Sequence, residues 1–430
     1  MAFINPHADI RACRSLKWLL SWAFLVVSQG VVAQEPVTLK SLLVLANSHY
    51  PALQAARLEM KAALDDLEGS RRLYWPTVSA VVETASTTAS VTTPSKFLQV
   101  EQTIWDAGSI NARIAESKSI SDVQTLRAAI VQEDVHLQLT NAWQNLLASK
   151  GRMDVAQQAI ERLQAFQLQM LRRVQVEASP RIDLELANSR ILQTEVEFTT
   201  AQNSFKQALN RIEQYSGRKD LKTRALEPGA LAIIAPTAAF DESLYAADWA
   251  AVMNQHPSIG KARAEAAQSQ TRLDQKKAEA WPQLYARVTK PLSTPDARFT
   301  SGPTAFLGLR YSSSAGFGNQ LQAQALATRV ASAEELVNGA ATDLRQNLQV
   351  DLDEYVNAKL RIASLEKSVK GADLVLESYL RQFQGGKKTW QDLLNAVREL
   401  AQNEYTLADA RASMQGAYYR LQIRTGQDLQ

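Results

Sequence analysis

The sequence predicts a mostly helical protein with a small β part, in which long antiparallel coiled-coil hairpins are the main element. An internal duplication is the first indication, because Trp75 recurs as Trp281 and Asp183 recurs as Asp392 in the same order. Composition is the second, since only 17 Gly and 13 Pro occur among 430 residues, as is typical of long helices. The third is a Val/Thr/Ser-rich segment with little charge, which interrupts the helical pattern once in each copy.

The first 33 residues have the pattern of a secretory signal peptide. Three basic residues precede an apolar run at 18–27, and small or apolar residues lead up to Ala33, after which we expect cleavage. A membrane anchor is the alternative, but the run is shorter than the roughly 20 residues that a spanning helix needs. The single cysteine, Cys13, lies in this segment, so the mature chain is expected to have no disulfide and no N-terminal lipidation site.

The duplication divides the remaining chain into two repeats, at 34–217 and 244–430, joined by a linker at 218–243. We expect each repeat to contain a helix, two strands and a long helical hairpin. The linker contains Pro228 and Pro236 and has no counterpart after the second repeat.

The first repeat begins with a helix and continues into strands. Apolar residues three and four positions apart predict a helix at 39–71, broken near Pro51 and ended before Pro76. Alternating apolar residues at 77–104 predict two strands joined by a loop around Pro94. The same transition follows the second copy of the Trp-Pro pair, so two hairpin-like strand pairs are expected per chain.

The remainder of each repeat predicts a coiled-coil hairpin. From the glycine at 108 to Ser179 no proline occurs, and part of this stretch has apolar residues at a period near 3.5. At about 1.5 Å per residue, such a helix is a rod of roughly 100 Å. After a turn at Pro180, a heptad pattern at 184–212 predicts the returning helix, and its counterpart lies at 393–421.

Four short strands cannot close a barrel, and open sheet edges are not tolerated in lipid. If the strands enter a membrane, they must therefore close by oligomerisation into a shared β-barrel.

With these features the chain resembles the TolC family of outer membrane efflux and secretion channels, the outer membrane factors. The features are the duplicated helix, the Trp-Pro entry to the strands, the passage Gln-Thr-Ile-Trp-Asp-Ala-Gly at 102–108, and the Asp-Leu pairs after each hairpin turn. The resemblance implies a homotrimer with a 12-stranded barrel in the lipid of the cell outer membrane. Its long hairpins would form an α-barrel, a tunnel through the periplasm. A periplasmic adaptor and an inner membrane transporter, ABC or proton-driven, are the implied partners.

The resemblance also implies a gate at the periplasmic tip, where the hairpins turn. Its acidic residue in the first repeat corresponds to Asp183, and its aromatic and basic partners correspond to Phe383 and Lys388. Asp392 matches a pore-facing acidic ring, and Asn395 matches a second ring that here lacks its carboxylate. Phe383 also lacks the hydroxyl of a tyrosine, so we expect a weaker lock and a single cation-attracting ring.

Each of these residues has a local explanation that stays open. Thr389 and Asp392 fit a capping box, and Lys388 fits a solvated turn. Trp75 and Trp281 fit either an aromatic belt at a membrane interface or a protein core.

Three functions follow from the sequence. Type I secretion of a protein, such as an adhesin or toxin, is preferred, because the expected mature chain lacks an acylated cysteine and its last helix is followed by a short C-terminus. The outer membrane component of a drug or metal efflux pump is the alternative, and a periplasmic coiled-coil adaptor without a pore belongs to another class. We find no pattern for an enzyme, a cofactor or a metal site, and a net charge of +3 does not indicate nucleic-acid binding.

Overall fold

The computed structural model describes residues 37–83, 86–87, 90–91, 94–221, 249–293, 302–311 and 318–426. The predicted signal peptide and most of the predicted linker lie outside these ranges. The fold is mostly helical with a small antiparallel sheet, which confirms the predicted fold class.

The first repeat contains two helices, two principal strands and a helical hairpin. Their order is α1 (Leu39–His49), α2 (Pro51–Arg71), the 3-10 turn η1 (Arg72–Tyr74), β1 (Thr77–Glu83), β4 (Ser95–Trp105), α3 (Ser109–Gln175) and α4 (Arg181–Ser216). Two short strands, β2 (Ser86–Thr87) and β3 (Ser90–Val91), form a separate pair between β1 and β4. As predicted, the first helix is broken at Pro51, which takes the first position of α2.

The second repeat follows the same order. It contains α6 (Ala250–Gln255), α7 (Pro257–Ala278), β5 (Gln283–Ser293), β6 (Thr304–Arg310), α8 (Asn319–Gln384) and α9 (Trp390–Thr425). Gly217 and Gly426 end α4 and α9 with φ of 70° and 69°, a left-handed conformation that glycine adopts without steric cost. The recurring glycine therefore marks the same helix end twice.

The passage at 102–108 turns the chain from strand to helix. Asp106 accepts hydrogen bonds from the backbone N–H groups of Gly108 and Ile110, and Ala107 and Gly108 both have positive φ. The carboxylate thus satisfies two N–H groups at the start of α3 that have no partner within the helix.

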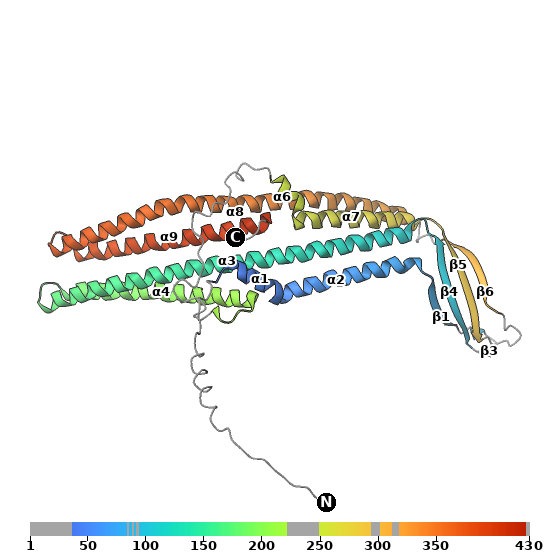
Figure 1. The fold of residues 1–430 in the computed structure, drawn as a ribbon, viewed down its shortest axis with the longest axis horizontal. Coiled ribbons are helices and arrows are strands. Elements are labelled where there is room, and N and C mark those ends of the chain that lie inside the picture. Colours follow the sequence, from blue (N-terminus) through green and yellow to red (C-terminus); the bar gives the residue numbers. More distant parts are fainter. Residues whose placement is uncertain are drawn as a thin grey trace, which may run out of the picture.

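The molecule is an elongated rod with the sheet at one end and both hairpin turns at the other (Figure 1). The α3/α4 hairpin and the α8/α9 hairpin lie side by side, and α2 and α7 flank the half nearer the sheet (Figure 1). A buried cluster around Trp143, Phe205 and Tyr355 joins the two hairpins near mid-length, and a second cluster around Phe166 and Leu393 lies toward the turns. In the described parts of the chain, no helix is both long and apolar enough to cross a membrane.

The four principal strands form one antiparallel sheet in the order β1-β4-β5-β6. Both predicted strand pairs are present, as β1–β4 and β5–β6, and they form a single sheet because β4 of the first repeat pairs with β5 of the second from Lys96 to Trp105. Strand pairing between distant segments depends on register, which alternation within one strand does not specify.

Candidate functional site

The sheet has one apolar face and one polar face. Directly paired residues of neighbouring strands share a face, so the register assigns each side chain. The apolar face carries Val78, Ala80, Val82, Leu98, Val100, Leu284, Ala286, Val288, Ala305, Leu307 and Leu309, with Lys96, Gln102 and Lys290 as polar members. The opposite face carries Thr77, Ser79, Glu83, Ser95, Gln99, Glu101, Thr103, Gln283, Tyr285, Arg287, Thr289, Thr304 and Arg310, with Val81, Phe97, Pro291, Phe306 and Gly308 as apolar members.

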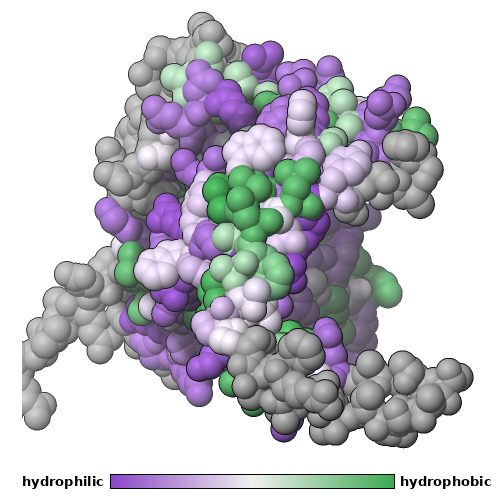
Figure 2. All heavy atoms as spheres, turned by 90° about the vertical axis from the view of Figure 1, so that its right-hand side faces the viewer, coloured by the Kyte–Doolittle hydropathy of each residue, from purple (hydrophilic) through white to green (hydrophobic). Residues whose placement is uncertain are grey.

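The apolar face is uncovered in the single chain. Val78, Val288, Leu307 and Leu309 are all exposed. Figure 2, which faces the sheet end of the rod, shows a hydrophobic patch with hydrophilic side chains on both sides. An apolar surface of this kind indicates contact with lipid or with another protein.

Aromatic side chains gather where the sheet meets the helices. Trp75 and Trp281, which lie two residues before the starts of β1 and β5, are 72% and 62% exposed. Trp105, at the end of β4, and Tyr311, just after β6, are exposed at the same end. Trp105 follows an irregularity in the β4–β5 register and pairs with Leu284, so strand alternation alone did not indicate its place.

Trp390 is the centre of contacts at the opposite end of the rod. Its indole Nε1 donates to the backbone oxygen of Asp183 at 2.9 Å, which ties α9 to the start of α4. Its ring lies 5.5 Å from the ring of Phe383, and the guanidinium of Arg173 lies 4.9 Å from the same Phe383 ring. Phe383 of α8 and Trp390 of α9 are both buried. Because Arg173 belongs to α3 and Asp183 to α4, these contacts join all four long helices at the tip.

The predicted capping box is present at the start of α9. The Thr389 hydroxyl oxygen accepts from the Asp392 backbone N–H at 3.1 Å, and the Asp392 carboxylate accepts from the Thr389 N–H at 3.1 Å. Hydrogen bonds from Thr389, together with the charge of Lys388, lower the pKa of Asp392. This carboxylate is therefore ionised at neutral pH.

The structure brings some of the predicted gate residues together and leaves others apart. Asp183 and Phe383 both contact Trp390, whereas the Lys388 ammonium lies 4.3 Å from the ring centre of Tyr379. Asn395 is half-buried one turn beyond the capping box. Within the described residues, no ion pair joins the side chains of Asp183 and Lys388.

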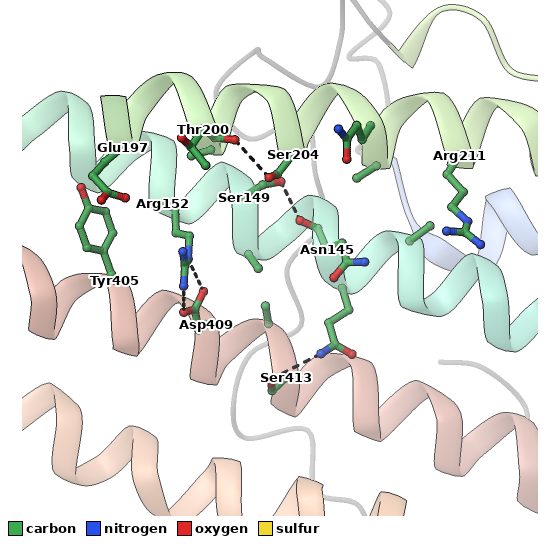
Figure 3. A pocket seen from close by; sticks show the side chains of 17 residues that line it. Asn145, Ser149, Arg152, Glu197, Thr200, Ser204, Arg211, Tyr405, Asp409 and Ser413 are labelled. Carbon is green, nitrogen blue, oxygen red and sulfur yellow. Dashed lines mark hydrogen bonds and ion pairs between the residues drawn. The ribbon is translucent and has the colours of Figure 1, made fainter. Parts of the chain in front are cut away.

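A polar groove of about 540 Å³ lies between α3, α4 and α9 (Figure 3). Arg152 of α3 makes two hydrogen bonds to the Asp409 carboxylate of α9, at 2.8 and 2.6 Å. Tyr405 lies beside Glu197 (Figure 3). Burial of the Tyr405 phenol and, to a lesser extent, the negative charge of Glu197 raise the pKa of this phenol to about 12. Sequence reasoning missed this groove because its residues lie far apart in the chain.

Comparison with solved structures decides the fold. A membrane protein from Pseudomonas aeruginosa aligns with a TM-score of 0.78 at 14% identity, covering 90% of this chain and 93% of that one. The Vibrio cholerae outer membrane protein VceC aligns with a TM-score of 0.77 at 14% identity, covering 90% and 96%. The Campylobacter jejuni CmeC outer membrane channel also aligns with 0.77 at 14% identity, covering 98% and 94%.

The chain has the fold of these outer membrane channels. No family model matches the sequence, and a search of curated proteins found no match. The outer membrane channel fold therefore rests on three-dimensional similarity. Among the described residues, no group of three or more His, Cys, Asp or Glu side chains is placed to hold a metal ion.

Proposed function

We propose that this chain forms a homotrimeric channel-tunnel in the cell outer membrane, with its helical hairpins in the periplasm. The observation that carries the proposal is the sheet with one apolar face, one polar face and two open edges. Transmembrane barrels place apolar side chains toward lipid and polar ones toward the lumen, and they leave no strand edge unpaired.

Three chains supply the closure. The edge strands β1 and β6 pair with β4 and β5 on their inner sides, and within the described sheet their outer edges have no partner strand. When β6 of one chain pairs with β1 of the next, three copies form a barrel of twelve strands, the arrangement that the family resemblance implies. Trp75, Trp105 and Trp281 would then form an aromatic belt at the periplasmic interface of the membrane.

The tip of the helical rod is proposed as the periplasmic gate. Asp183, Phe383 and Lys388 form or adjoin the turns, and three copies of Asp392 would form a ring of negative charge that favours cations. Asn395 adds no charge to this ring. Trp390 joins the two hairpins of each chain and is proposed here as an additional gate residue.

The exported substrate and the partners stay predictions. We expect docking with a periplasmic adaptor and an inner membrane ABC or proton-driven transporter. Protein secretion is our preferred substrate class from the sequence, and small-molecule efflux is the alternative. A pore-free adaptor is disfavoured because such a protein has no need of a two-faced sheet.

Paired substitutions on one strand test the barrel. Val288→Arg places a charge on the apolar face, which costs about 2–4 kcal/mol near the middle of a bilayer. Thr289→Arg places the same charge on the polar face of β5. We expect the first variant to lose most outer membrane trimer in detergent extracts, and the second to assemble and conduct ions in planar bilayers. A soluble monomer without conductance from the unchanged protein, or equal assembly of both variants, would refute the proposal.

Three substitutions test the gate. Asp183→Ala, Lys388→Ala and Trp390→Phe should each raise single-channel conductance, and Trp390→Phe does so by removing the indole donor while keeping a ring against Phe383. Gln391→Ala changes an exposed neighbour and is the matched control. Unchanged conductance in the three variants would leave only the local roles in helix capping and packing.

A further inference from the structure

A charged cluster lies on the polar face of the sheet, toward the end where the strands meet the helices. Glu101 of β4 lies opposite Arg287 of β5, and its Oε2 is 4.0 Å from the Arg287 Nε. Arg310 of β6 reaches across β5, and its NH2 group donates to Glu101 Oε1 at 3.0 Å. One carboxylate is thus shared by two guanidinium groups from different strands.

Aromatic rings hold both guanidinium groups in place. The Arg310 guanidinium lies 4.6 Å from the centre of the Tyr285 ring, and that of Arg287 lies 5.2 Å from the same ring and 5.9 Å from the Phe306 ring. Arg287 also donates to the Tyr285 hydroxyl at 3.0 Å. A Cβ atom on Gly308 would lie 2.6 Å from the Tyr285 ring, so glycine leaves room for the ring across β6. The side chains of the cluster are therefore held in position by contacts within the sheet.

Positive charge dominates on the open side of this cluster. Two guanidinium groups and one carboxylate give a net charge of +1. The Glu101 side chain is only 19% exposed, whereas those of Arg310 and Arg287 are 53% and 33% exposed. On this face of the four described strands, the other charged residue is Glu83, at the far end of β1.

We propose that this cluster forms an anion-attracting belt on the wall of the channel lumen, which takes small inorganic and carboxylate anions. The inference rests on the proposed function, because only closure of the sheet into a barrel turns its polar face into a lumen wall. Threefold symmetry would place six guanidinium groups and three carboxylates at one height. Given the strand tilt of about 40°, this height lies roughly 10 Å from the helix end of the barrel.

The dimensions make the belt effective only at low salt. Twelve strands about 4.8 Å apart, tilted by about 40°, form a barrel roughly 24 Å across. The Debye length is about 10 Å at 0.1 M salt and about 3 Å at 1 M. The field of the belt therefore reaches the axis of the lumen at 0.1 M and is confined to the wall at 1 M.

Ion selectivity in planar bilayers tests the belt, with KCl as the probe. The double variant Arg287→Gln/Arg310→Gln leaves Glu101 alone and changes the belt from +1 to −1 per chain. We expect the potassium-to-chloride permeability ratio to rise about threefold at 0.1 M and to change little at 1 M. Glu101→Gln should lower the same ratio at 0.1 M, and Arg310→Lys should keep it.

Lys290→Gln is the matched control, because it removes a positive charge from the opposite face of the same strand. It should leave the permeability ratio unchanged. If the unchanged protein conducts but neither the double variant nor Glu101→Gln alters the ratio at 0.1 M, the belt is refuted while the channel stands. If Lys290→Gln shifts the ratio as the double variant does, the assignment of the faces is wrong. Absence of any conductance would overturn the proposed function and the belt with it.

Discussion

Arg420 is the residue whose loss should most weaken the helical part of the chain. It is 9% exposed on α9 and binds Asp351 at 2.7 Å and Glu354 at 2.6 Å, both on α8. It also donates to Asn141 at 3.2 Å and Gln144 at 2.8 Å on α3. One side chain thus joins the two hairpins through four hydrogen-bonded partners.

The expected cost of Arg420→Met follows from what the substitution leaves behind. Methionine keeps the apolar contacts of the side-chain stem but leaves the buried Asp351 without its nearest cation. Breaking a buried ion pair on one side costs about 3–5 kcal/mol. Arg424 still lies 2.9 Å from Asp351, and Glu354 is 37% exposed, so the lower end applies, about 3 kcal/mol.

Thermal unfolding followed by helical circular dichroism measures this effect on the detergent-solubilised protein. With an unfolding entropy of about 2.1 cal/mol/K per residue over roughly 400 residues, about 3 kcal/mol corresponds to a Tm shift of about 3–4 °C. Arg211→Met is the control, since Arg211 is the exposed counterpart of Arg420 in the first repeat and should shift Tm by less than about 1 °C. Equal shifts for both variants would refute the role of the buried network.

Two further predictions concern the helices. Gly151→Ala would place a Cβ 2.8 Å from the Cβ of Ala408, and because neither atom can rotate away, α3 and α9 must separate at a cost of about 1–3 kcal/mol. Gly371→Ala, with nothing within 4 Å, should instead stabilise by about 0.4–1 kcal/mol, and Tm gives the sign of each; a gain in Tm for Gly151→Ala would contradict the close approach. Because hydrogen bonding by Thr389 lowers the pKa of Asp392 in the folded chain, its contribution is present above the unfolded value of 3.8 and is lost as pH falls through the lower folded value. The Tm of Asp392→Asn should therefore lie below that of the unchanged chain at pH 7 and converge with it in acid, and a Tm difference that persists there would exclude this linkage.

The sequence predicted what is periodic and repeated. Apolar heptads specify α3 and α4 because each helix packs along its length on its neighbour, and alternation along β1 and β5 specifies which side chains share a face. The capping box of Thr389 and Asp392 was also predictable, because its residues lie within one turn.

Contacts between distant segments were not predictable in this way. The β4–β5 pairing joins the two repeats, and the sequence of neither strand specifies the strand with which it pairs. Trp390 contacts Asp183 across 207 positions. Its counterpart in the first repeat is Arg181, so the duplication did not predict this contact. Arg420 is buried while its counterpart Arg211 is exposed, so corresponding positions of the two repeats have different surroundings.

The strand order has a consequence for assembly. Within one chain, the β4–β5 seam joins the end of one repeat's strand pair to the start of the next. In the proposed trimer, the β6–β1 seam between neighbours also joins a strand pair of one repeat to a strand pair of the other, so the barrel is a ring of six strand pairs. Covalent duplication makes three of the six seams intramolecular, and only three encounters between chains remain. A chain that contained only one repeat would need six copies to assemble. The duplication therefore lowers the dependence of pore assembly on protein concentration.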